Sequence, residues 1–187
     1  MEEMADILAH LPIEILTLDS YPDIGDIPET GDTLKDNAFI KAQTVHDFTG
    51  LPALADDTGL EVDALGGAPG VFSARYAGPS ATFDDNCHKM LDALNGKPIE
   101  ERTARFRTVI AFVKREEKLW TEGLVDGLIL DQRKGSCGFG YDSIFYYPEL
   151  KKTFAELKKS EKNNISHRGK ALRNFCRILE KRVKSNG

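Results

Sequence analysis

The sequence predicts an α/β fold around a mixed β-sheet, and three observations support this prediction. Helical patterns alternate with short apolar runs in the first half of the chain. Strand-like segments then cluster in the middle, which favours a mixed sheet over a purely parallel one. The 187 residues suffice to bury a sizeable core. Because no stretch has the composition of a linker, we expect one domain over residues 1–187.

A helix, a strand and a loop are expected before the first capped helix. Four apolar residues at helical spacing predict a helix over residues 1–11: Met4, Ile7, Leu8 and Leu11. Residues 13–18 are apolar and β-branched, which predicts a strand, and the prolines and glycines of residues 21–31 mark a loop. Thr33 is followed by an acid three residues later, as in a capping box, and opens a helix that Gly50 ends.

The stretch LADDTGLEVDALGG, residues 54–67, carries the first candidate site. Strands over residues 51–55 and 60–65 would flank a turn made by Asp56, Asp57, Thr58 and Gly59. On these residue types alone, a solvated turn is the simplest interpretation. The triplet Asp-Thr-Gly also matches the aspartic-protease signature. That chemistry needs two such aspartates on a strand-dominated scaffold, and the sequence has one copy.

A bound metal would give the paired acids a function. Adjacent carboxylates raise each other's proton affinity unless a cation neutralises them, and Mg²⁺ is the usual hard partner for oxygen ligands. Glu29, in the stretch PETGDT, is on its own an ordinary loop acid. It becomes a candidate ligand only as a second metal carboxylate beside Asp57.

The second half of the chain predicts a capped helix, a group of strands and a last helix. Thr82 and the acid three residues later cap a helix that runs to Gly96. Strands are expected at residues 104–113, 119–124, 125–130 and 143–147. Gly123 and Gly127 are expected to break the second and third of these strands, as in a bent hairpin. A basic loop follows, and Ser166 begins a helix with one apolar face: Leu172, Phe175, Cys176 and Leu179.

Composition and charge narrow the classes of partner. The formal net charge is -5, whereas a nucleic-acid polymer needs a basic surface, so no such partner is expected. Residues 151–184 are nevertheless rich in cations that could bind a small anion. Without a membrane-length apolar run or a secretion signal, we expect a cytoplasmic protein with no membrane partner. Three distant cysteines indicate neither a zinc site nor a disulfide framework: Cys87, Cys137 and Cys176.

Two further stretches carry candidate ligand-binding residues. FGYDSIF, residues 139–145, is either a glycine-kinked strand entry with core aromatics or a loop whose glycines, Gly138 and Gly140, let the backbone approach a ligand. In the second interpretation an aromatic ring stacks on a flat base, and Asp142 accepts from a ring N–H. SEKNNISHRGKAL, residues 160–172, is either a solvated helix start or a donor cluster for carbonyl and phosphate oxygens. The donors would be Lys162, His167 and Arg168.

Taken in order, six segments resemble the inosine triphosphate pyrophosphatase family, the XTP/dITP diphosphatases. They are ETGDTLKDNAFIKA, LPALADDTGLEVDALGGAPGVFSARYAG, ARFRTVIAF, FGYDSIF, KTFAEL and EKNNISHRGKAL. Each segment is weak alone, but the ordered set is specific and spans nearly the whole chain. The resemblance implies a two-lobed α/β homodimer around a long, twisted sheet. It also implies hydrolysis of a non-standard purine nucleoside triphosphate (ITP, dITP or XTP) to the monophosphate and pyrophosphate with Mg²⁺.

The same resemblance implies a role for each candidate residue. Glu29 and Asp57 would hold Mg²⁺, and Asp57, supported by Asp56, would accept the proton of the attacking water. The residues that would contact substrate are Thr58, Phe139, Gly140, Tyr141, Asp142, Lys162, His167 and Arg168. Inosine and xanthosine carry a 6-keto acceptor where adenosine carries an amino donor. A donor cluster that includes His167 and Arg168 would therefore accept the former and reject the latter.

The sequence departs from the family at its beginning. Family members start with an apolar strand and a Ser/Thr-Gly-Asn-x-x-Lys segment that cradles the triphosphate, and neither is present here. MEEMADIL, residues 1–8, resembles the helix that follows that segment. Two explanations remain open. Either translation begins further upstream, which we favour, or the shortened chain is an impaired or non-catalytic nucleotide-binding or dimerisation module.

Overall fold

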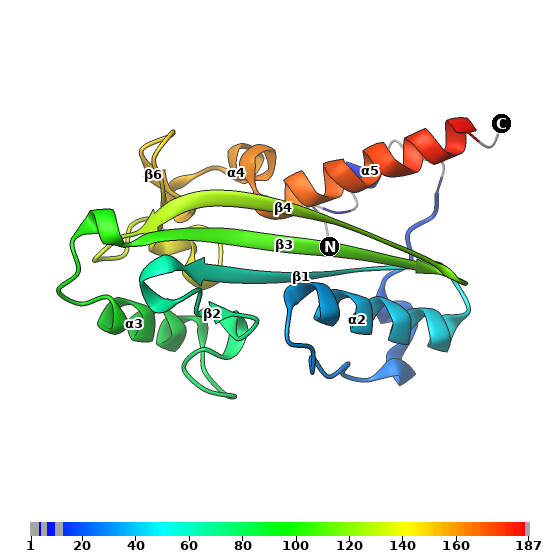
Figure 1. Ribbon diagram of the computed structural model, residues 1–187, viewed down its shortest axis with the longest axis horizontal. Coiled ribbons are helices and arrows are strands. Elements are labelled where there is room, and N and C mark those ends of the chain that lie inside the picture. Colours follow the sequence, from blue (N-terminus) through cyan, green and yellow to red (C-terminus); the bar gives the residue numbers. More distant parts are fainter. Residues whose placement is uncertain (1–3, 5–6, 10–12, 186–187) are drawn as a thin grey trace. The chain divides into compact units, whose positions relative to one another are not determined.

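The computed structural model describes residues 4, 7–9 and 13–185 and has the predicted α/β class (Figure 1). The described residues form a six-stranded sheet in the order β2-β1-β3-β4-β5-β6. Its strands are β1 Ala53–Val62, β2 Pro69–Gly70, β3 Thr103–Lys114, β4 Glu117–Ile129, β5 Phe145–Tyr147 and β6 Lys152–Thr153. The α-helices are α2 Leu34–Thr49, α3 Phe83–Ala93, α4 Lys159–Ile165 and α5 His167–Ser185. The pairs β1–β2, β4–β5 and β5–β6 are antiparallel.

The chain forms two compact units, each with its own apolar core. Unit 1 comprises residues 1–57, 108–123 and 167–187, and unit 2 comprises residues 58–107 and 124–166. The buried core of unit 1 consists of Met4, Leu8, Ile110, Ala171, Leu172, Phe175 and Cys176. The core of unit 2 centres on three phenylalanine rings with centroids 4.5–5.8 Å apart: Phe106, Phe145 and Phe154. Burial of such large rings supplies much of the hydrophobic stabilisation of a small unit.

The predicted starts of α2 and α3 are confirmed, because both helices begin at the capping residues that the sequence indicates. The Thr33 side chain accepts from the Asp36 N–H at the start of α2, and Gly50 ends this helix in the left-handed conformation. Thr82 and Asp85 form a reciprocal capping box at α3, which ends at Ala93 rather than near Gly96. These signals act within a few residues of one another, so the sequence alone reveals them.

The predicted turn at Asp56–Gly59 is wrong, because β1 continues through it as one strand. Asp, Thr and Gly favour turns when their polar groups must satisfy the local backbone. Here the backbone belongs to the sheet, and the two carboxylates find cationic side chains instead. Tertiary pairing therefore overrides the local preference.

Gly123 and Gly127 do not break β4, contrary to the prediction. A Cβ at Gly123 would lie 2.1 Å from the carbonyl oxygen of His167, where α5 begins. A Cβ at Gly127 would lie 2.6 Å from both the Phe145 ring and the Tyr146 carbonyl oxygen. Both glycines thus permit close approach of a neighbouring element, which is the other role of glycine in a strand.

Two further predictions of secondary structure are wrong. Residues 13–18 form no strand, and Ile13 and Leu16 are about half exposed, while Ile15 packs against the core of unit 1. An apolar run becomes a strand only where a neighbouring strand pairs with it, and the described sheet offers this run no place. The predicted basic loop before Ser166 contains the short helix α4.

The predicted N-terminal helix lies mostly outside the described residues. Of its four apolar positions, Met4 and Leu8 are buried in the core of unit 1, and Ile7 packs against that core. No helix in the described part of the chain is long and apolar enough to cross a membrane.

Candidate functional site

The two adjacent aspartates of β1 have different partners within unit 1. Side chains alternate between the two faces of a strand, so Asp56 and Asp57 point in opposite directions. Leu54, on the face of Asp56, packs against the core that includes α5, and Asp56 itself pairs with Arg168 of α5. Asp57 instead pairs with Lys41 of α2. The two carboxylates therefore do not form a proton-sharing dyad, and each is balanced by its own cation.

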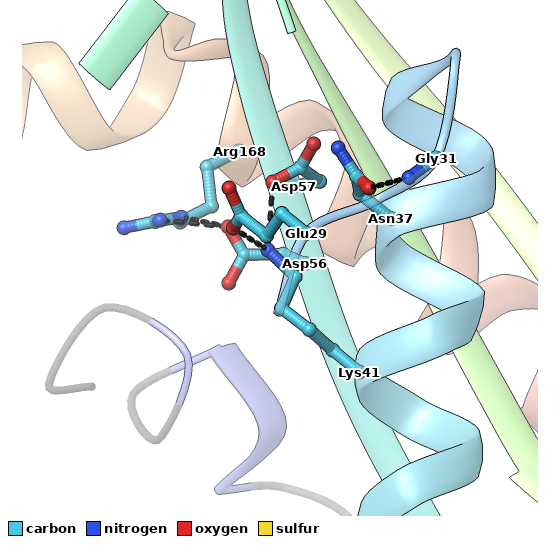
Figure 2. Close-up of polar contacts among 7 residues, drawn as sticks. All are labelled: Glu29, Gly31, Asn37, Lys41, Asp56, Asp57 and Arg168. Atoms are coloured by element: carbon cyan, nitrogen blue, oxygen red, sulfur yellow. Dashed lines mark hydrogen bonds and ion pairs between the residues drawn. The ribbon is translucent and has the colours of Figure 1, made fainter. Parts of the chain in front are cut away.

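Lys41 joins the two acids that were predicted to hold a metal. Its Nζ lies 2.7 Å from Asp57 Oδ1 and 2.9 Å from Glu29 Oε1 (Figure 2). Oxygens from the loop before α2 and from β1 thus converge on one positive charge. Lys41 is absent from the sequence-based predictions, although it lies within the family-like segment ETGDTLKDNAFIKA. A signal was available, because Asn37 and Lys41 are one turn apart on the face of α2 that carries the buried residues Ala38 and Ala42.

Burial and charge set the protonation of this cluster. Asp57 is 7% exposed, and burial raises the pKa of its carboxyl, opposed by Lys41 and reinforced by the negative charge of Glu29. Burial also disfavours the charged form of Lys41. The hydrogen bonds from Lys41 to Asp57 and Glu29 outweigh this effect, so the pKa of Lys41 is raised. Lys41 therefore carries a proton at neutral pH.

Arg168 holds Asp56 through two donors. Arg168 Nε and Nη2 lie 3.0 and 2.7 Å from the same oxygen, Asp56 Oδ2. Gly123 allows this arrangement, because its missing side chain lets the first turn of α5 lie against β4. His167 is the first residue of α5 and precedes Arg168. Two of the three predicted donors thus sit at the start of the helix that pairs with Asp56.

Unit 2 carries the aromatic candidates. Phe139 is 63% exposed, and the Lys162 Nζ lies 5.1 Å from its ring centroid and 5.5 Å from that of Phe154. Asp142 is buried, accepts from the Phe139 N–H at 2.9 Å and forms an ion pair with Lys162. An amide and an ammonium thus fix Asp142 beneath an exposed ring.

Glycine and tyrosine shape this loop in different ways. Gly138 has φ +83°, and a Cβ there would lie 2.1 Å from Asp142 Oδ2, so only glycine fits. Gly140 begins the 3₁₀ helix Gly140–Ser143, which replaces the first residue of the predicted strand. Tyr141 lies in the core, where its hydroxyl donates to the Ser73 carbonyl oxygen and burial raises its pKa.

The structure thus groups the predicted residues by unit. Unit 1 brings together Glu29, Asp56, Asp57 and Arg168, with His167 adjacent, and unit 2 brings together the residues 139–142 and Lys162. Thr58 follows Asp57 on β1 and is half-buried. Among the described residues, no group of three or more His, Cys, Asp or Glu side chains is arranged to hold a metal. The Glu29–Asp57 pair nevertheless fits Mg²⁺, which in proteins often takes one or two carboxylates together with water and substrate phosphates.

Comparisons with known proteins find relatives that match nearly the whole chain. A dITP/XTP pyrophosphatase of Desulforamulus reducens is 48% identical over 182 residues, which cover 97% of this chain and 90% of that protein. Another from Geobacter sulfurreducens is 48% identical over 173 residues, covering 92% and 87%. The solved HAM1 protein of Coxiella burnetii has a TM-score of 0.90 at 44% identity, covering 96% of this chain and 92% of that one. The Ham1 protein of Staphylococcus aureus has a TM-score of 0.89 at 38% identity, covering 97% and 95%.

The family assignment rests on the full length of the match. The sequence model of the Ham1 family covers residues 1–178, which include every candidate residue named above. The solved relatives share the α/β fold that the resemblance implied. The resemblance is therefore confirmed, and this chain belongs to the Ham1 family.

Proposed function

We propose that this chain hydrolyses the triphosphates of non-standard purine nucleosides, ITP, dITP and XTP, to the monophosphate and pyrophosphate. Family membership supports this reaction, since curated relatives at 46–48% identity carry the name dITP/XTP pyrophosphatase. The observation that carries the proposal is the convergence of Glu29 and Asp57 on one cationic nitrogen. Attack on a phosphorus atom among negative oxygens requires such a cation-binding pair and a proton acceptor.

Glu29 and Asp57 would hold the cofactor, Mg²⁺. When bound, this ion neutralises part of the negative charge on the phosphate oxygens. The chain itself contributes the spacing of the two carboxylates and the positive charge of Lys41. With Lys41 close to both acids, their mutual repulsion is offset before any ligand arrives.

Asp57 would accept the proton of the attacking water. Burial raises the pKa of the Asp57 carboxyl, so its carboxylate is a stronger base than an exposed one. A stronger base takes the proton of water more readily. The hydrogen bond from Lys41 orients one oxygen of Asp57. Asp56, held by Arg168, would support Asp57 from the neighbouring position of β1.

The remaining candidates would bind the nucleotide. The exposed ring of Phe139 would stack on the base, with Gly140 and Tyr141 shaping the loop and Asp142 accepting from a ring N–H. Lys162, His167 and Arg168 would supply donors to the 6-keto group and the phosphates, and Thr58 would touch the substrate beside Asp57. A 6-amino group would face donors at the same position, so ATP would be a poor substrate.

The proposed form of the protein is a homodimer, as the family resemblance implies, and its proposed location is the cytoplasm. Light scattering after size-exclusion chromatography measures the oligomeric state directly. A mass of twice 20.8 kDa is expected, and a monomer that is fully active would contradict the dimer.

Incubation of the protein with ITP, XTP, dITP and ATP in the presence of Mg²⁺ tests the reaction itself. We expect pyrophosphate and the monophosphate as the primary products of the first three, and much slower turnover of ATP. Orthophosphate as the primary product, or equal turnover of ATP, would reject the proposal. Removal of Mg²⁺ with a chelator should stop the reaction, and its addition should restore it.

A further inference from the structure

One buried side chain next to the carboxylates has no role in the reaction proposed above. Asn37, in the first turn of α2, has an exposed fraction of 0%. Its Oδ1 accepts from the Gly31 N–H at 2.7 Å (Figure 2). Gly31 follows Glu29 by two residues, so this hydrogen bond ties the loop that carries Glu29 to the helix that carries Lys41.

The loop lies too close to α2 to carry a side chain at Gly31. A Cβ on Gly31 would lie 2.6 Å from Asp36 Cβ, 2.8 Å from Asn37 Oδ1 and 2.9 Å from the Asn37 backbone nitrogen. All three distances are shorter than real Cβ contacts, so the loop lies directly against the helix. Asn37 thus determines where Glu29 enters the cluster.

The other end of the same amide faces Asp57. Figure 2 shows Asn37 Nδ2 on the Asp57 side of the Asn37 amide. Yet Nδ2 has no acceptor in hydrogen-bonding geometry among the described residues. A buried donor without an acceptor is costly. Its presence beside the proton acceptor therefore indicates a function rather than packing.

We propose that Asn37 is a positioning residue that sets the spacing of Glu29 and Asp57 around one divalent cation. Its Oδ1 holds the Glu29 loop through Gly31, and its Nδ2, which has no acceptor among the described residues, is free to donate to the Asp57 carboxylate when the metal is bound. The inference rests on the proposed function, because it assumes that the two carboxylates share a metal. Side chains that orient metal ligands typically contribute about 10- to 100-fold to metal affinity or activity.

Mn²⁺ binding to the whole chain without nucleotide, measured by electron paramagnetic resonance, tests the proposal independently of turnover. Asn37→Ala should weaken Mn²⁺ binding about tenfold. Gly31→Ala should do the same without removing a polar group, because the added Cβ displaces the Glu29 loop. Gln43→Ala is the matched control, since it removes an amide from the same helix at a position where the amide donates to the exposed Asp47. This control should bind Mn²⁺ like the parent.

A steady-state readout separates positioning from loss of structure. In Asn37→Ala, the Mg²⁺ concentration for half-maximal rate should rise about tenfold, while KM for ITP at saturating Mg²⁺ stays unchanged. Unchanged Mn²⁺ affinity in folded Asn37→Ala and Gly31→Ala would overturn the proposal, as would a parent protein that binds no Mn²⁺. If Asn37→Ala does not fold, the Mn²⁺ affinity of Gly31→Ala alone tests the proposal. A parent that binds Mn²⁺ but releases no pyrophosphate would reject the proposed function and leave the Mn²⁺ comparison valid.

Discussion

The candidate residues of the two units differ in how their charges are balanced. In unit 1, three carboxylates form ion pairs with two cations. Lys41 pairs with both Glu29 and Asp57, and Arg168 pairs with Asp56. In unit 2, the buried Asp142 pairs with Lys162, which also lies near two aromatic rings, one of them the largely exposed Phe139. Unit 1 thus presents a polar, acidic cluster, and unit 2 an apolar ring above a neutralised pair.

Because of this difference, the two clusters suit different parts of a nucleotide. Carboxylates repel phosphates unless a cation intervenes, so the cluster of unit 1 suits a metal and the chemistry on phosphorus. An exposed aromatic ring over a neutralised pair suits a flat, uncharged base. We expect substitutions in unit 1 to change metal dependence and turnover, and substitutions in unit 2 to change affinity for the base.

The largest expected effect is that of Asp57→Asn. It removes the proposed proton acceptor and one of the two proposed metal carboxylates, so kcat for ITP should fall by about 10²- to 10⁴-fold. The fold should survive, because Lys41 keeps its ion pair with Glu29. Asp47→Asn, an exposed position on α2, serves as the control and should keep full activity. Turnover at the parental rate in folded Asp57→Asn would show that this aspartate is merely structural.

Phe139→Ala should act on the base rather than on the metal. Loss of one base–aromatic stack costs about 1–3 kcal/mol, so KM for ITP should rise about tenfold with little change in the Mg²⁺ requirement. Phe48→Ala, at a similarly exposed phenylalanine of α2 in unit 1, is the matched control. An altered Mg²⁺ requirement with an unchanged KM would reverse the assignment of the two units.

How far the sequence predicts the structure depends on how local each signal is. The caps of α2 and α3 involve residues three positions apart, so both helix starts were predictable. The ion pair of Asp57 spans 16 residues and that of Asp56 spans 112. Without these partners in view, two aspartates in a row indicate a turn, and the sequence alone therefore misplaced β1.

The candidate site residues were identified in a different way. Glu29, Asp56, Asp57 and Arg168 came from residue types and from ordered motifs, and the structure brings all four into one unit. Lys41 and Asn37 were missed because a lysine and an asparagine within a helix ordinarily face solvent. Their spacing of one turn on the buried face of α2 was the sequence signal, and their burial beside Asp57 distinguishes them in the structure.

Two glycines of the same strand allow a direct comparison of the units. Gly123→Ala places a Cβ against α5 in unit 1, and Gly127→Ala places one against β5 in unit 2. Each should lower the free energy of unfolding by about 1–3 kcal/mol, as measured by urea denaturation. Only Gly123→Ala should also lower kcat, because it displaces the turn that carries Arg168. The single tryptophan, Trp120, lies in unit 1 against Lys35, so its fluorescence should change in Gly123→Ala alone. A change in both variants would mean that the two units do not respond separately.

The smallest expected effect concerns the capping box of α3 in unit 2. Hydrogen bonds from the Thr82 hydroxyl and backbone N–H hold the pKa of the Asp85 carboxyl below its ordinary value. A carboxyl with a lowered folded-state pKa stabilises the fold above its unfolded pKa of about 3.9, and this contribution disappears as the pH falls through the folded value. Asp85→Asn should therefore be less stable than the parent in urea denaturation at pH 7, and the difference should shrink towards pH 3. A difference that stays constant over this range would assign the effect to packing instead of charge. The matched variant Asp47→Asn removes a carboxylate from an exposed position of α2 in unit 1, outside any capping box, and is the control for the loss of one surface charge.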